Sequence, residues 1–242
     1  ALASYALRDT GRWSELDALL ETVKVAWEEV NQDPPPFALM PYAFAPYVAM
    51  ARDDRVGADA AAATLERLPA DQFGFIRTWA AACREDDPSK LDLPVLRPSP
   101  TTRYELALLF PFLNERGIRA EPWLLEAAWA WQRQRKTDNL LRCLQIAQAL
   151  ADQDAVRLRE AINDAEQHGL IPHAARMRIV LAQMTGDPAP LEQARPVLER
   201  LGDRQFLRRL EEVAARFDKR IDDAPHRTEP PRSNTIRQGC YL

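Results

Sequence analysis

Cysteine is scarce in this chain, and the spacing of the few that occur excludes two classes of small protein. Cys83, Cys143 and Cys240 are the only cysteines among 242 residues, and they stand far apart. An odd number at wide spacing matches neither a disulfide framework nor a zinc-ligand pattern. We therefore expect reduced thiols and no metal site. Cys143 shares an apolar helix face with Leu140, where it is expected to be a small buried hydrophobe rather than a nucleophile.

Long hydrophobic runs are also missing. The most apolar stretch, residues 37–51, is too short for a membrane helix and is interrupted by Pro41 and Pro46. We expect no membrane partner and a cytoplasmic protein. No basic segment followed by an apolar one opens the sequence, and the first residue is Ala1 rather than Met. We interpret the chain as a piece of a longer protein.

Glycine is equally sparse, with eight residues that stand singly. A phosphate-binding loop of the G-x-x-x-x-G-K-[ST] type is absent, so no cluster of backbone amides can converge on a phosphate. The aspartate pairs at 53–54, 86–87 and 222–223 fall at predicted helix ends or in loops rather than on a strand. We expect no catalytic site and no cofactor in this chain.

Neither sign of charge dominates the sequence. Lysine and arginine together number 32, and aspartate and glutamate 36, which leaves a net charge of −4. A chain with this balance has no overall attraction to nucleic acid or to an anionic membrane. Nearly all the cations are arginine, which we interpret as a compositional bias of the source genome.

What the sequence has in abundance is helical periodicity. From residue 121 onward apolar residues recur at steps of three and four, as Leu140, Leu144 and Ala147 do, which places them on one helix face. No stretch of comparable length alternates apolar and polar residues as a half-buried strand does. The sequence therefore predicts an all-α protein.

Signals that end helices recur at regular intervals. They fall near Lys136, Asp152, Gly169, Gly186 and Gly202, every 16 or 17 residues. Two helices of this length make a unit of about 33 or 34 residues, which is the period of tetratricopeptide repeats. We predict a tetratricopeptide-like solenoid of antiparallel helical hairpins.

A weaker copy of this pattern is present near the N-terminus. Gly11 separates two helical segments, and Trp13 and Leu16 begin an apolar stripe that resembles the second helix of a tetratricopeptide repeat. A more degenerate copy spans residues 50–68, with Asp54 in place of the glycine. Degenerate units are compatible with a solenoid, because each unit buries only one face against its neighbour.

The chain is predicted to divide into four segments. Residues 1–84 are expected to form degenerate helical repeats, 85–102 a proline-rich connecting loop and 103–218 the regular repeats. Residues 219–242 are polar, contain prolines and lack an apolar face, which predicts a flexible tail.

Residues 165–213, AEQHGLIPHAARMRIVLAQMTGDPAPLEQARPVLERLGDRQFLRRLEEV, resemble the C-terminal end of large bacterial regulators. These regulators join a class III adenylate or guanylate cyclase domain, an AAA-type ATPase module and a tetratricopeptide-like helical region, related to the helical sensor regions of ATP-dependent transcriptional regulators. The resemblance is strongest after residue 103. It implies a C-terminal sensor or interaction region, and it does not carry the enzymatic parts over to this chain.

The aromatic segment EPWLLEAAWAWQRQRK, residues 121–136, carries the candidate binding surface. Trp123 and Trp131 lie at helical spacing and are expected to fill gaps between helices, while Trp129 points elsewhere on the same helix. Trp129 either packs against Tyr104 or Phe112, or it contributes to a peptide- or ligand-binding groove on the concave face. The residues predicted for that surface are Trp129, Arg133, Arg135 and Arg142.

Two histidines and two prolines break the helical patterns without indicating a site. His168 and His173 flank a glycine turn at a spacing that matches no standard pair of metal ligands. We interpret them as histidines that interact with a helix C-terminus. Pro111 and Pro196 interrupt helical patterns and are expected to kink a helix or to mark where one restarts.

The functional prediction is a non-catalytic helical-repeat module for protein interaction or effector sensing. Its partner would be a protein or peptide, or a small effector in the concave groove. The alternatives are the regulatory domain of a transcriptional activator and a nucleic-acid-binding repeat, the latter suggested by Arg200, Arg204, Arg208 and Arg209. Glu212 follows Arg208 at helical spacing and balances its charge, so we expect a polar outer face rather than a nucleic-acid partner.

Overall fold

The computed structural model describes residues 2–30, 42–66, 70–85 and 103–222, and within these ranges it is helical with no strand. This confirms the predicted all-α helical-repeat class. The predicted loop at 85–102 and the predicted tail fall almost entirely outside the described residues. The elements are α1 (Leu2–Asp9), α2 (Trp13–Val30), a short 3-10 helix η1 (Tyr42–Phe44), α4 (Ala45–Ala51), α5 (Arg55–Glu66), α6 (Ala70–Cys83), α7 (Arg103–Glu115), α8 (Pro122–Arg135), α9 (Asp138–Ala151), α10 (Ala155–Gln167), α11 (Ile171–Thr185), α12 (Ala189–Leu201) and α13 (Arg204–Asp222).

The predicted helix ends after residue 121 are confirmed. Helices α8 to α12 end at residues 135, 151, 167, 185 and 201, each within two residues of its predicted break. Asp154 begins α10 as its N-cap, where its carboxylate accepts hydrogen bonds of 3.0 Å from the backbone N–H groups of Val156 and Arg157. Local signals are sufficient here because a cap or a turn is decided by residues adjacent in sequence. The last helix runs on to Asp222, past the predicted end at residue 218.

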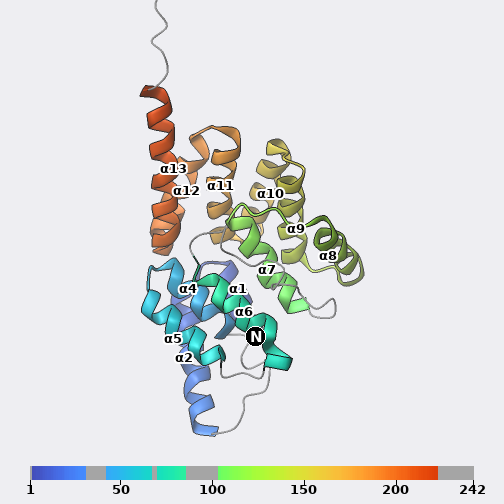
Figure 1. The fold of residues 1–242 in the computed structure, drawn as a ribbon, viewed down its shortest axis with the longest axis vertical. Coiled ribbons are helices and arrows are strands. Elements are labelled where there is room, and N and C mark those ends of the chain that lie inside the picture. The colour runs from blue at the N-terminus through green and yellow to red at the C-terminus, as the bar shows by residue number, and fades with distance from the viewer. Residues whose placement is uncertain (1, 31–41, 67–69, 86–102, 223–242) are drawn as a thin grey trace, which may run out of the picture.

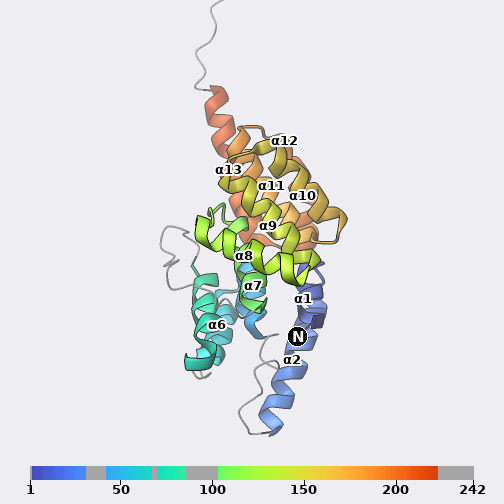
Figure 2. The same ribbon diagram turned by 90° about the vertical axis from the view of Figure 1, so that its right-hand side faces the viewer.

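The helices stack in chain order. From α8 to α13 each packs against the next, and these helices lie side by side as the regular part of the solenoid (Figure 1). The N-terminal helices α1 to α6 gather at one end of this stack in both views (Figure 2). Helix α7 packs against α9 and α11 of the regular stack and also contacts α6, so it stands between the two parts. Helix α1 contacts α11, and α4 contacts α13.

The turn between α1 and α2 fits tightly against the regular repeats. Gly11 has a φ of +75°, in the left-handed region that side chains disfavour. A Cβ at this position would collide with the side chain of Leu201 and would lie 3.3 Å from Cγ of Pro172. Glycine is required here both by its backbone conformation and by the close approach of two helices.

One hydrophobic core crosses the predicted boundary at residues 85–102. It includes Trp13 and Leu16 of α2 and Trp79 of α6, together with Leu109 of α7 and Leu144 of α9, all of them at most 2% exposed. A second cluster joins α11, α12 and α13. The degenerate and the regular repeats therefore share their core rather than forming independent domains.

Both helix-interior prolines lie within continuous helices. Pro111 is inside α7 and Pro196 inside α12, so neither helix restarts at its proline. Proline has no N–H to bond the carbonyl four residues earlier. In α7 that carbonyl belongs to Ala107, and it accepts a hydrogen bond of 3.5 Å from Nη1 of Arg8 instead. Among the described residues, no helix combines the length and the apolar character that crossing a membrane demands.

Candidate functional site

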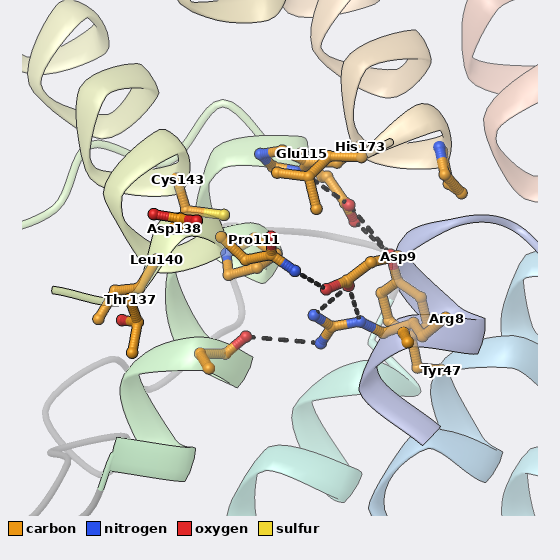
Figure 3. A pocket seen from close by; sticks show the side chains of 15 residues that line it. Arg8, Asp9, Tyr47, Pro111, Glu115, Thr137, Asp138, Leu140, Cys143 and His173 are labelled. Atoms are coloured by element: carbon orange, nitrogen blue, oxygen red, sulfur yellow. Dashed lines mark hydrogen bonds and ion pairs between the residues drawn. The ribbon is translucent and has the colours of Figure 1, made fainter. Parts of the chain in front are cut away.

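A cavity of about 340 Å³ lies between α1, α7, α9 and α11, where the N-terminal helices meet the regular repeats (Figure 3). It opens to the surface beside Ala6, Asp138 and Asn139, which line it and are solvent-exposed. Its volume is within the range of about 300–1,000 Å³ typical of small-molecule pockets. Much of its wall is apolar and is formed by Ala6, Ala107, Pro111, Leu140, Leu170 and Pro172.

One polar wall of the cavity ties α1 to α9. The Nε–H of Arg8 donates to Oδ1 of Asp9 at 2.7 Å, and Nδ2 of Asn139 donates to the other oxygen, Oδ2, at 2.9 Å (Figure 3). The guanidinium of Arg8 also lies 4.8 Å from the ring centroid of Phe44. Arg8 and Asp9 are both at least nine-tenths buried, so their charges are compensated within the protein.

The opposite wall aligns a thiol, an imidazole and a carboxylate. Nδ1 of His173 donates to Oε1 of Glu115 at 3.0 Å, and both side chains are buried. The other ring nitrogen, Nε2, points toward the thiol of Cys143 (Figure 3) and forms no hydrogen bond with the described residues. The hydroxyl of Tyr47 donates to the same carboxylate at about 3 Å. His173 is therefore held in one orientation between Cys143 and Glu115.

His173 and Glu115 both favour their charged forms. Burial alone would lower the pKa of His173, but the charge that Cys143 can carry and the Glu115 carboxylate outweigh burial and raise it to about 9. Burial would raise the pKa of Glu115, but the charge of Arg176 and the hydrogen bonds from His173 and Tyr47 lower it to about 2. Near neutral pH the site contains an imidazolium and a carboxylate.

Arg176 of α11 holds this carboxylate from the other side. Its Nη1 donates to Oε2 of Glu115 at 2.9 Å and also contacts the Tyr47 hydroxyl, and its Nε donates to Oδ2 of Asp203 at 2.7 Å. Asp203 precedes α13 and accepts the backbone N–H of Phe206 at 3.2 Å. The fully buried Arg176 thus joins α4, α7, α11 and the start of α13.

Aromatic rings enclose the same guanidinium. Cζ of Arg176 lies 5.4 Å from the ring centroid of Trp13, 4.7 Å from that of Tyr47 and 4.4 Å from that of Phe206. These distances are within the range of cation–π attraction. The negative partners raise the pKa of Arg176 despite its burial, so the group stays charged.

Of the residues predicted for the binding surface, Trp129, Arg133 and Arg135 lie on α8 and Arg142 lies on α9. Trp129 donates through Nε1 to Oε1 of Gln148 at 3.3 Å and lines a separate groove of about 330 Å³ between α8, α9 and α10. Arg142 is buried, donates to the carbonyl of Asp138 and pairs with Asp164 at 3.2 Å. Arg133 and Arg135 are exposed on α8 and do not line that groove.

Two side chains differ from their sequence-based interpretation. Trp123, expected to fill a gap between helices, is the exposed indole, with 49% of its surface accessible, while Trp129 and Trp131 pack partly against the core. His168 does cap the C-terminal end of α10, but His173 lies in the first turn of α11 and is buried against Glu115. The reason is that the helix begins between the two histidines, so they face different neighbours.

The sequence predicts few residues of the cavity or of its supporting network. It indicates no role for Glu115 or Arg176, predicts only a buried hydrophobe at Cys143, and predicts no site at Pro111, although Pro111 lines the cavity. A usable signal existed in α11, IPHAARMRIVLAQMT, where His173, Arg176 and Arg178 interrupt a largely apolar helix. Buried polar groups in such a helix must find partners, which predicts a network without naming its members.

Comparisons with known proteins add no assignment. No family model, curated protein or solved structure matches this chain. Within the described ranges, no group of three or more His, Cys, Asp or Glu side chains is placed to hold a metal ion. The fold and the site together define the class, an all-α helical-repeat protein with a ligand-sized cavity between its two parts.

Proposed function

We propose that this chain is a non-catalytic helical-repeat module that senses a small effector bound in the cavity. The resemblance of residues 165–213 supports the wider context, in which the module is the C-terminal part of a bacterial signalling regulator of the cyclase and AAA ATPase type. A regulator of this kind needs a part that converts the presence of a molecule into a change of conformation.

The position of the cavity carries the proposal. Its walls come from α1 on one side and from α7, α9 and α11 on the other, so a bound molecule contacts the degenerate and the regular repeats at once. A ligand shifts a conformational equilibrium only as far as its affinity differs between the two states. Because the cavity exists only where α1 is docked, occupancy stabilises the docked arrangement of the N-terminal helices.

The lining indicates the class of effector. Apolar side chains such as Leu140 and Leu170 form much of the wall, while the polar groups stand at two places, around Asp9 and around His173. This combination favours a small molecule with a hydrocarbon body and one or two polar ends.

The nucleic-acid alternative has less support. Arg208 donates to Asp53 at 2.9 Å, and Arg209 donates to the backbone carbonyl of Glu115 at 2.8 Å. These two arginines bind groups of the chain itself, so they serve the packing of α13 against α4 and α7 rather than offering a row of free cations to phosphates.

A thermal-shift screen of small carbonyl, carboxylate and aromatic compounds tests the proposal. We expect some of them to raise the melting temperature of the wild-type chain and to have no effect on Ala107→Trp, whose indole would occupy the cavity. The matched control is Ala60→Trp on the exposed face of α5, which should respond as the wild type does. The proposal is wrong if no compound stabilises the wild type, or if Ala107→Trp is stabilised equally.

A further inference from the structure

The cavity contains a cysteine in an unusual environment. Cys143 of α9 lines it, and the imidazole of His173 faces the sulfur (Figure 3). The side chain of His173 is 6% exposed, and its Nε2 has no hydrogen-bond partner within the described part of the chain. A buried nitrogen without such a partner, aimed at a thiol in a cavity, is a second observation beside the cysteine itself.

Glu115 completes the arrangement. Its carboxylate accepts the Nδ1–H of His173 at 3.0 Å, which fixes the ring so that Nε2 is the nitrogen presented to Cys143. A thiol, a base that faces it and a third group that orients the base are the parts of an activated nucleophile. The thiolate is the form of cysteine that reacts, and Nε2 of His173 is the nitrogen placed to take the thiol proton.

The chain provides its own contrast in Cys83. This thiol is 1% exposed, does not line the cavity, and has a pKa that burial raises to about 12. Cys83 is therefore an inert buried cysteine, the kind that the sequence predicted at Cys143. The difference between the two lies in the cavity and in His173, which only Cys143 has.

We infer that Cys143 is the covalent attachment site of the effector, and that the cavity captures a small α,β-unsaturated carbonyl compound by conjugate addition. This inference rests on the effector-sensing function proposed for the same cavity. The apolar wall near the sulfur, formed in part by Leu140, Leu170 and Pro172, suits the hydrocarbon part of such a compound better than a hydrated polar oxidant.

The addition balances without any further reagent. The thiol proton is on Nε2 of His173 when the sulfur is a thiolate. The sulfur forms a bond to the β-carbon, and the electron pair of the C=C bond moves toward the carbonyl as an enolate. The α-carbon then takes the proton from Nε2, which leaves a neutral imidazole whose Nδ1–H still donates to Glu115. Nothing is oxidised or reduced, and no group leaves.

Labelling with N-ethylmaleimide, an α,β-unsaturated imide, tests the inference on the full chain. Cys240→Ser removes the cysteine outside the described residues, so that peptide mapping compares Cys143 with Cys83. We expect one adduct per chain, at Cys143, formed at least about tenfold faster than at Cys83 because only Cys143 is activated. Equal rates at the two cysteines, or no adduct at Cys143, would overturn the inference.

A variant of His173 separates activation from mere exposure. His173→Gln should slow labelling at Cys143 about tenfold at pH 7 and leave the rate at Cys83 unchanged, because glutamine offers no nitrogen that can take the thiol proton. An unchanged rate at Cys143 in a folded His173→Gln contradicts the inference. If this variant does not fold, the comparison of Cys143 with Cys83 in the wild type still decides.

Further arms distinguish this inference from the proposed function. If the compounds stabilise Cys143→Ser as much as the wild type in the thermal-shift screen, the effector-sensing function is supported and the covalent attachment is wrong. If the wild type shows neither stabilisation nor labelling, both the proposed function and the covalent attachment are wrong. If hydrogen peroxide oxidises Cys143 to sulfenic acid faster than the maleimide adds to it, Cys143 reacts with oxidants. The inference that it captures an α,β-unsaturated carbonyl compound would then be wrong.

Discussion

His173 lies between two groups that can carry negative charge, the thiol of Cys143 and the carboxylate of Glu115, and both favour its protonated form. Arg176 contacts the far side of the same carboxylate and pairs with Asp203, so His173 and Arg176 of α11 alternate with the carboxylates of Glu115 and Asp203. Each of these buried charges has a partner of opposite sign, which compensates for the loss of hydration.

This arrangement predicts a pH dependence of stability. The pKa of His173 is about 9 in the folded chain and about 6.5 in the unfolded one, so its contribution is complete below pH 6.5 and is lost as the pH rises through 9. We expect the free energy of unfolding to fall by on the order of 3 kcal/mol across this window. Urea titrations at several pH values measure it, and His173→Gln should lack the decline. An unchanged slope in the variant would assign the dependence to another group.

At the scale of helices and turns, the loop between α1 and α2 shows how one residue positions an element. Gly11 allows α1 to turn back and pack against α11, and α1 in turn brings Arg8 and Asp9 to the cavity wall. The proline in α7 has a complementary role, since it frees the carbonyl of Ala107 to accept from Arg8. In both cases, a backbone property of one residue allows a contact between helices that are distant in sequence, α1 with α11 and α1 with α7.

The docking of this turn can be tested with two matched glycine substitutions. Gly11→Ala and Gly186→Ala both place a side chain at positive φ, +75° and +72°, which costs about 1 kcal/mol or somewhat more. Only at Gly11 does the new Cβ also collide with Leu201 and crowd Pro172, whereas nothing lies within 4 Å at Gly186. Urea unfolding should show Gly11→Ala as the more destabilising by about 1–3 kcal/mol, the usual cost of overpacking. Equal losses would mean that the turn is not tightly docked.

At the scale of the whole molecule, Arg176 is where the degenerate and the regular repeats are joined. Its partners belong to α4, α7 and the start of α13, and its ring neighbours add α2. The hydrophobic core extends across the same region. Two parts connected in this way are expected to unfold together, because neither keeps its buried charges compensated alone.

Replacing Arg176 by Met should therefore have a large effect. The substitution leaves Glu115 and Asp203 buried with a partner removed, and breaking a buried ion pair in this way costs about 3–5 kcal/mol. Arg52→Met is the control, since Arg52 and Asp17 pair at 2.6 Å but are 37% and 44% exposed, and such surface pairs contribute about 0–1 kcal/mol. Denaturation followed by circular dichroism compares the two. Similar losses for both variants would contradict a central role for Arg176.

The sequence alone determined the all-α class and the helix ends from Lys136 to Gly202, because capping and apolar periodicity depend on residues a few positions apart. It did not determine the site. His173 and Glu115 are 58 residues apart, and Tyr47 and Arg176 are 129 apart. Whether such residues meet depends on how the helices pack, and no local pattern encodes that. The cavity, the partner of each buried charge and the imidazole beside Cys143 were therefore decided only by the tertiary structure.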